Sequence, residues 1–121
     1  MYSAILDGAL QLVVVTAQGK LGSSEVAEMV TRARELSAGR GWNILYDMSG
    51  AAVEGINSGE LYWMPRKLPA LREGSGKVRV ALLYPPKYHE LARFWENAFR
   101  NAGLQAKAFE TREEALKWLR A

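Results

Sequence analysis

Hydrophobic residues recur along this chain with two different spacings, and the changes between them predict alternating strands and helices. Short runs that are mostly apolar, or that alternate apolar and polar residues, are typical of strands. They occupy residues 2–6, 10–16, 42–46, 77–84 and 105–109. Apolar residues three or four positions apart are typical of helices, and they occupy residues 24–36, 57–72, 91–102 and 111–119. The predicted element order is therefore β-β-α-β-α-β-α-β-α.

Local signals indicate where some of these elements begin and end. Asp7-Gly8 favours a tight turn with positive φ, so we expect the first two strands to form an antiparallel hairpin. Ser24 can cap the first helix, because its side-chain oxygen can accept from a free amide of the first turn. Thr111 and Glu114 have the spacing of a capping box at the start of the last helix.

The alternation of strands and helices predicts one α/β domain that spans residues 1–121. We expect about five strands in a mainly parallel sheet, with the first strand antiparallel and helices on both faces. The segments between parallel strands are expected to cross over in the right-handed sense.

Composition narrows the classes of function. The 121 residues are 49% hydrophobic and 24% charged, which is ordinary for a globular protein and excludes a disordered chain. The net charge of +3 comes from basic residues that are spread along the chain, so we expect no nucleic-acid partner. The chain has no cysteine, which excludes disulfides and thiol catalysis. Because the sequence shows neither a secretory signal nor an apolar run long enough to cross a membrane, we expect a cytoplasmic protein.

Three stretches of the sequence resemble one known family. The strand end NILYDMSG at residues 43–50 resembles a strand that closes in aspartate, an apolar residue and serine. INSG at residues 56–59 resembles the loop that follows, and FETREEALKWL at residues 109–119 resembles the closing strand and helix. With the element order, these stretches resemble the STAS domains, and within them the SpoIIAA-like branch.

The resemblance implies the STAS fold and a regulatory role through protein–protein interaction, as in anti-sigma-factor antagonists. It also implies a phosphate acceptor at Ser58, although Asn57 stands where the antagonists carry a second hydroxyl. The SpoIIAA-like branch in turn resembles the CRAL-TRIO lipid-binding domains in architecture, which implies an apolar ligand as an alternative.

Two interpretations stay open for each polar candidate. A phosphate on Ser58 would lie at a helix N-terminus, where free amides stabilise negative charge. The simpler interpretation is that Ser58 is an N-cap, and we expect this one. Ser49 is a second, weaker candidate for the same chemistry. Asp47 lies at the carboxyl end of a predicted strand, where α/β sheets bind ligands, but we expect it to accept hydrogen bonds from nearby backbone amides instead.

The segment from 61 to 71 is unusual because it mixes large apolar residues, cations and two prolines. Pro65 and Pro69 each remove a helix donor, so they break or kink the predicted helix. The remaining candidates for contact with a partner or ligand are Leu61, Tyr62, Trp63, Met64, Arg66 and Lys67. Such a mixture suits an anionic membrane surface or a lid over an apolar cleft. A helix that buries its apolar side on the sheet explains it equally well.

The sequence offers little for catalysis. His89 is the single histidine, and a catalytic triad would need a base, a carboxylate and an activated nucleophile together. No cluster of residues has the spacing of metal ligands, so we expect no metal and no cofactor. We therefore expect a binding domain with a protein partner rather than an enzyme. A dimer is compatible with the sequence, which does not determine the oligomeric state.

Overall fold

A computed structural model of the protein describes residues 1–53, 59 and 78–121. Five strands form one sheet: β1 (Tyr2–Asp7), β2 (Leu12–Lys20), β3 (Asn43–Ala52), β4 (Arg79–Leu83) and β5 (Gln105–Phe109). The helices are α1 (Ser23–Ala38), α3 (His89–Asn101), α4 (Arg112–Arg120) and a short 3-10 helix, η3 (Pro86–Tyr88). The helix predicted over 57–72 falls in a part of the chain that the structure does not describe, apart from Gly59.

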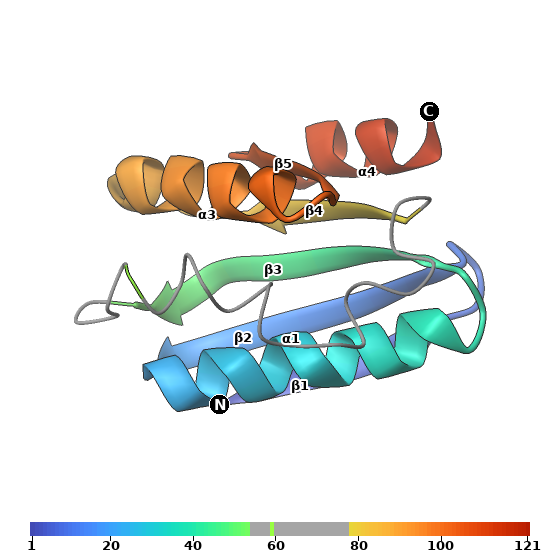
Figure 1. The fold of residues 1–121 in the computed structure, drawn as a ribbon, viewed down its shortest axis with the longest axis horizontal. Helices are drawn as coiled ribbons and strands as arrows, with labels where there is room; N and C mark the ends of the chain where they lie inside the picture. Colours follow the sequence, from blue (N-terminus) through green and yellow to red (C-terminus); the bar gives the residue numbers. More distant parts are fainter. Residues whose placement is uncertain (54–58, 60–77) are drawn as a thin grey trace.

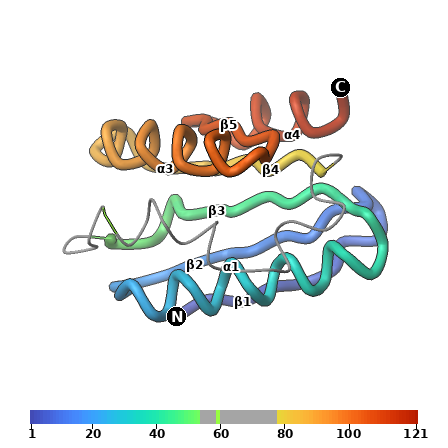
Figure 2. The backbone as a smooth tube through the Cα atoms, in the orientation of Figure 1, coloured from blue at the N-terminus to red at the C-terminus, as the bar shows by residue number. Residues whose placement is uncertain are grey.

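The strands lie side by side in chain order, β1-β2-β3-β4-β5 (Figure 1). β1 pairs antiparallel with β2, and every later pair is parallel. This is the predicted α/β architecture: a mainly parallel five-stranded sheet whose first strand is antiparallel. The backbone trace shows α1 running along β1 and β2, and α3 running along β4 and β5 (Figure 2).

Each face of the sheet has its own hydrophobic core. On one face, α1 and α3 pack on the inward residues of the strands, and the largest fully buried side chains there include Tyr46, Phe99 and Ile44. On the other face, the smaller cluster is formed with α4 through Ala115 and Leu119. Helices therefore cover both faces, as the alternation of periods predicts.

Side chains of the sheet hold the C-terminal end of α4. The last carbonyl groups of a helix have no partner within it, so they need donors from elsewhere. Arg79 Nη1 donates to Trp118 O at 2.8 Å and to Ala121 O at 2.7 Å, and Asn43 Nδ2 donates to Leu119 O at 2.9 Å. These bonds fix α4 against β3 and β4. At the other end, Thr111 Oγ1 accepts from Glu114 N at 3.3 Å, which confirms the predicted N-cap.

The first hairpin differs from the prediction. A four-residue turn, 8–11, replaces the two-residue turn at Asp7-Gly8, and the positive φ falls on Gln11 (53°). Asp7 Oδ1 accepts from Leu10 N at 3.0 Å, so the aspartate stabilises a longer turn, and β2 starts at Leu12 instead of residue 10. The antiparallel pairing itself is confirmed.

Two further boundaries were predicted wrongly. α1 begins at Ser23 and its N-cap residue is Gly22, which has no side chain to cap it, so Ser24 lies inside the helix and is not its cap. β3 continues to Ala52, whereas the sequence predicted its end near Tyr46 and a loop from Ser49. The extension is stabilised by β2, because Gln18, Gly19 and Lys20 pair with residues 50–52 after a bulge.

Candidate functional site

The carboxyl ends of the parallel strands meet at one edge of the sheet, and α/β proteins bind their ligands at such an edge. In this protein the edge carries the end of β3, the end of β4 and the start of α3. Of the residues predicted to form a site, Asp47 and Ser49 lie near this edge. Asp47 is in the middle of β3 and not at its end, where the sequence placed it, but it pairs with Leu83, the last residue of β4. Both belong to β3, two positions apart, so they project from the same face of the sheet.

Asp47 is the centre of a small polar cluster. Its Oδ1 accepts from the Ser49 amide at 3.1 Å and from Ser49 Oγ at 2.5 Å. Its Oδ2 lies 3.8 Å from Arg112 Nη1, at the start of α4. Asp47 therefore has the role expected for it, that of an acceptor for a nearby backbone amide. The same bonds hold the exposed Ser49 hydroxyl and the Arg112 guanidinium together on the surface.

The other predicted site residues fall outside the described part of the chain. They are Asn57, Ser58, Leu61, Tyr62, Trp63, Met64, Arg66 and Lys67. Their roles as a phosphate acceptor, partner surface or ligand lid stay predictions.

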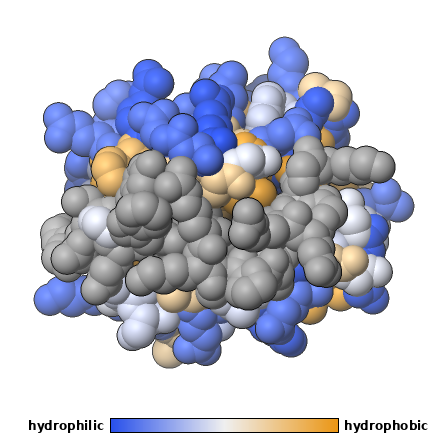
Figure 3. All heavy atoms as spheres, in the orientation of Figure 1, coloured by the Kyte–Doolittle hydropathy of each residue, from blue (hydrophilic) through white to orange (hydrophobic). Residues whose placement is uncertain are grey.

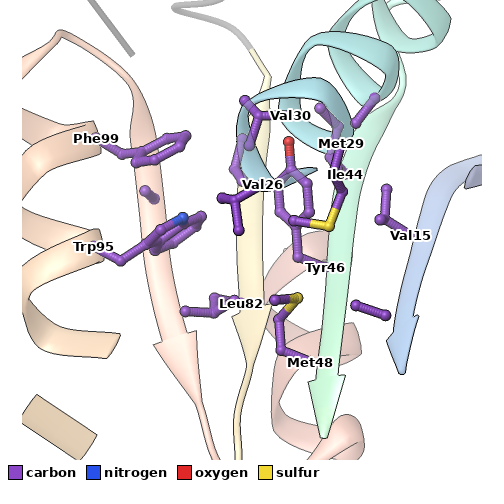
Figure 4. Close-up of a cluster of buried hydrophobic side chains, with 14 of the residues drawn as sticks. Val15, Val26, Met29, Val30, Ile44, Tyr46, Met48, Leu82, Trp95 and Phe99 are labelled. Atoms are coloured by element: carbon purple, nitrogen blue, oxygen red, sulfur yellow. The ribbon is translucent and has the colours of Figure 1, made fainter. Parts of the chain in front are cut away.

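On the opposite face of β3 the structure contains an apolar pocket. It has a volume of about 60 Å³ and lies between the N-terminal halves of α1 and α3. Its described walls come from α1, β3, β4 and α3, and they include Val26, Met29, Tyr46, Met48, Leu82 and Trp95. The close-up shows these side chains converging from three sides (Figure 4). A pocket of this size holds several water molecules or a short apolar group.

Aromatic side chains organise the pocket. The Tyr46 and Trp95 rings meet edge to face with centroids 6.0 Å apart, and Trp95 stacks on Phe99 at 4.3 Å. Such ring pairs have preferred geometries, so they restrict how the pocket can change shape.

Two tyrosines that line the pocket, Tyr84 and Tyr88, make polar contacts. Tyr88 Oη accepts from Val53 N at 3.2 Å, which joins the start of α3 to the residue that follows β3. The Tyr84 hydroxyl lies 3.0 Å from His89 Nδ1. Burial, with the nearby negative charge of Glu110, raises the pKa of Tyr84. His89 is an exposed residue at the start of α3, as expected. Its described partner is the Tyr84 hydroxyl and not a carboxylate.

The sequence analysis missed a buried polar pair beside the pocket. Arg34, on α1, is only 3% exposed, and Tyr46 is 1% exposed. Arg34 Nε, Arg34 Nη2 and Tyr46 Oη are all buried, and among the described residues these side chains interact with each other, without a hydrogen bond of good geometry. Burial lowers the pKa of Arg34. Burial also raises the pKa of Tyr46 to about 12, and the adjacent Arg34 charge partly opposes that rise. One signal was available: residue 34 lies at helical spacing from the apolar Val26 and Val30.

Within the described residues there is no group of three or more histidine, cysteine, aspartate or glutamate side chains that could hold a metal. No described helix is both long and apolar enough to cross a membrane. In the space-filling view, the part of the visible face over α3 is mostly hydrophilic, and small apolar areas appear nearer its centre (Figure 3).

Two solved structures share this fold. One is an uncharacterized protein of the DUF3478 family with a SpoIIAA-like fold, from Shewanella loihica PV-4. It is 21% identical to this chain in sequence, with a TM-score of 0.58, and the alignment covers 98% of this chain and 93% of that one. The anti-sigma factor antagonist SpoIIAA in its unphosphorylated form is 19% identical with a TM-score of 0.55, and the coverage is 100% and 99%. No curated protein matches the chain. The SpoIIAA-like family model matches residues 12–120, so this protein belongs to the SpoIIAA-like family.

Proposed function

We propose that this protein is a non-catalytic regulatory domain that binds another protein through the surface formed by residues 47–67. The observation that carries the proposal is the cluster of Asp47, Ser49 and Arg112, which lies on β3 level with the carboxyl end of β4. It presents a hydroxyl, a carboxylate and a guanidinium on one surface, within a fold that it shares with an anti-sigma factor antagonist. Charged and hydroxyl groups held in fixed positions give a protein interface its orientation and specificity.

The segment after β3 would extend this surface. Its predicted contact residues include Trp63, Arg66 and Lys67, and aromatic and arginine side chains are common at the energetic centre of protein interfaces. Phosphate on Ser58 would add about −1.5 to −2 charges to the same region and would act as a switch. We expect Ser58 to be a cap instead, so Ser58→Ala should leave partner binding unchanged.

Affinity capture from native cells tests the proposal. The wild type is compared with the double variant Arg66→Glu/Lys67→Glu, and with Lys117→Glu as a control of the same kind on the exposed surface of α4. We expect one stoichiometric partner that the wild type and Lys117→Glu retain and the double variant loses. Failure of the wild type to retain any partner, or equal retention by all three proteins, would contradict the proposal.

The apolar pocket supports a second candidate function, the binding of a small apolar ligand or an anionic membrane surface. In this function the segment 61–71 would form part of the binding surface. We expect 1-hexanol to raise the melting temperature of the wild type, because a ligand that binds only the folded state stabilises it. Ala92→Leu should weaken that effect, since Ala92 lines the pocket and the larger side chain would fill it. No stabilisation of the wild type by the alcohol would rule out the pocket as a ligand site.

The membrane form of this candidate is tested separately. We expect anionic vesicles to change the fluorescence of Trp63, and Trp63→Ala to remove that change while the fold is kept. Unchanged fluorescence with vesicles, together with a stability loss of about 3–5 kcal/mol in Trp63→Ala, would indicate that Trp63 is a core residue.

A further inference from the structure

The two outer edges of the sheet differ in how the rest of the chain protects them. β1 lies at one end of the sheet and β5 at the other (Figure 1). On β5, Glu96 Oε2 accepts from Ala108 N at 2.7 Å. Arg100 Nε donates to Ala106 O at 2.8 Å. Side chains of α3 therefore occupy the backbone groups with which a further strand would pair, so the β5 edge is blocked.

The hydrogen bonds of the first hairpin show which backbone groups of β1 point outward. Met1 and Gln18 exchange both of their bonds: Gln18 N donates to Met1 O at 2.8 Å, and Met1 N donates to Gln18 O at 3.1 Å. Bonded and non-bonded pairs alternate along an antiparallel ladder, and the register of β1 on β2 has no shift. Every second residue after Met1 therefore bonds to β2. The residues between them direct their N–H and C=O groups away from the sheet, and they are Tyr2, Ala4 and Leu6.

The β1 edge lacks the features that usually protect an edge strand. Such edges are blocked by charged residues, prolines, bulges or covering side chains. Residues 2–6 contain no charged residue and no proline, and the pairing of β1 with β2 contains no bulge. Within the described part of the chain, no hydrogen bond reaches the outward backbone groups of β1. The side chain of Ile5, in the middle of the strand, is 57% exposed. β1 thus presents an open edge to a further strand.

We propose that two copies of this chain pair through β1, antiparallel to each other and around a twofold axis beside Ala4. In this register Ala4 lies opposite Ala4 of the partner subunit, and Tyr2 lies opposite Leu6 of the partner subunit. Each outward N–H group then meets a C=O group of the other copy, so one strand is complementary to itself. The two sheets join into one, whose outer edges are the two blocked β5 strands. The assembly therefore closes at two copies.

The side chains of β1 fit the same register. Tyr2, Ala4 and Leu6 pack on the core under α1, and residues opposite each other in an antiparallel pair share a face, so α1 lies on the same side of the joined sheet in both copies. On the other face, Ile5 lies opposite Ser3 of the partner subunit and diagonally across from Ile5 of the partner subunit, within reach of both. The pairing therefore covers the exposed Ile5 side chain. The one charged residue of β1 is at its last position, so the two copies of this charge lie at opposite ends of the paired strands.

Sedimentation velocity from micromolar to millimolar concentrations measures the assembly. We expect the wild type to exchange between monomer and dimer. Ile5→Lys should raise the dissociation constant of the dimer by about tenfold or more, because it removes an apolar contact and places two like charges on neighbouring positions. Ile5→Thr is the matched control. It keeps a β-branched side chain and adds no charge, so it should raise the dissociation constant much less. Both variants should stay folded by circular dichroism, because the side chain is exposed in the monomer.

A mixing experiment identifies β1 as the contact. Ile5→Lys and Ile5→Glu should each dimerise weakly alone, and an equal mixture should recover a heterodimer, because opposite charges on the diagonal positions attract. A wild type that is monomeric throughout the concentration range would overturn the inference. Equal dimerisation of Ile5→Lys and the wild type, or no recovery in the mixture, would show that the copies meet elsewhere and would also overturn it. Assemblies larger than two copies would contradict the closure at β5.

Discussion

The outer edge of β5 is held by α3, and this contact gives the sharpest stability prediction. Ala106 and Ala108 lie on β5, which is the last strand of the sheet. Glu96 Oε2 accepts from Ala108 N at 2.7 Å, and Arg100 Nε donates to Ala106 O at 2.8 Å. Glu96 is buried, and its Oε1 lies 3.4 Å from Arg100 Nη1. Two side chains of one helix thus pair the backbone groups that an edge strand leaves free.

Glu96→Ala should destabilise the protein by about 2–4 kcal/mol. A hydrogen bond to a charged group contributes ~1.5–3 kcal/mol, and its loss leaves the Ala108 amide unpaired. The ion pair adds only ~0–1 kcal/mol, because the Arg100 side chain is half exposed and solvent screens it. Glu96→Gln is the matched control. It keeps an acceptor for Ala108 N and removes the charge, so it should cost about 1 kcal/mol.

Urea unfolding followed by far-UV circular dichroism measures both variants, and equal slopes would show that the midpoints report stability alone. A second readout is aggregation, because an unpaired strand edge can pair with another chain. We expect Glu96→Ala to aggregate at a lower concentration than Glu96→Gln. A loss of less than ~0.5 kcal/mol in Glu96→Ala, which is typical of an ordinary surface substitution, would refute the role given to this contact.

Two further predictions follow from the described contacts. The pKa of Tyr46 is raised from 10.0 to about 12 in the folded protein, so its contribution to stability is fully present below pH 10 and is lost as the pH rises toward 12. Urea unfolding midpoints measured across this pH range should therefore fall less in Tyr46→Phe than in the wild type. Thr111→Ala should cost about 1 kcal/mol because it removes the N-cap of α4, whereas Ser24→Ala should be nearly neutral because Ser24 lies inside α1 and Gly22 is the N-cap residue. Equal losses of stability in thermal unfolding would contradict this difference.

The sequence predicts the fold well where a periodic pattern is long and its ends are marked. β5 has the predicted bounds, 105–109, and the capping box at Thr111 places the start of α4 correctly. The apolar stripe of α3 is also correct, since Trp95, Ala98 and Phe99 are buried. In each case local preference and burial favour the same structure, so the pattern alone is sufficient.

The errors arise where a distant contact outweighs the local signal. Ser49 and Gly50 are small residues typical of a loop, but β3 continues through them because residues 50–52 pair with β2 beyond a bulge. The turn at Asp7 lengthened because the carboxylate bonds to an amide three residues later. Arg34 was overlooked because arginine is seldom buried, and only the packed structure shows that α1 turns it inward.

The sequence predicted the edge of the sheet where the candidate site lies, but only some of the residues that form it. The strand-end rule directs attention to Asp47, although β3 continues five residues beyond it and only the shorter β4 ends at its level. The pocket could not be predicted in the same way, because its walls come from four elements that are distant in sequence and meet only in the folded protein.

One strand, β3, contributes to both proposed sites. Tyr46 and Met48 point to the face covered by α1 and α3 and line the pocket, while Asp47 and Ser49 alternate with them and point to the opposite face. The two proposed sites therefore share one backbone. If a ligand in the pocket altered the affinity for a protein partner through β3, linkage requires that the partner alter the affinity for the ligand to the same extent. Measuring ligand affinity with and without the partner would test whether the two proposed functions are coupled.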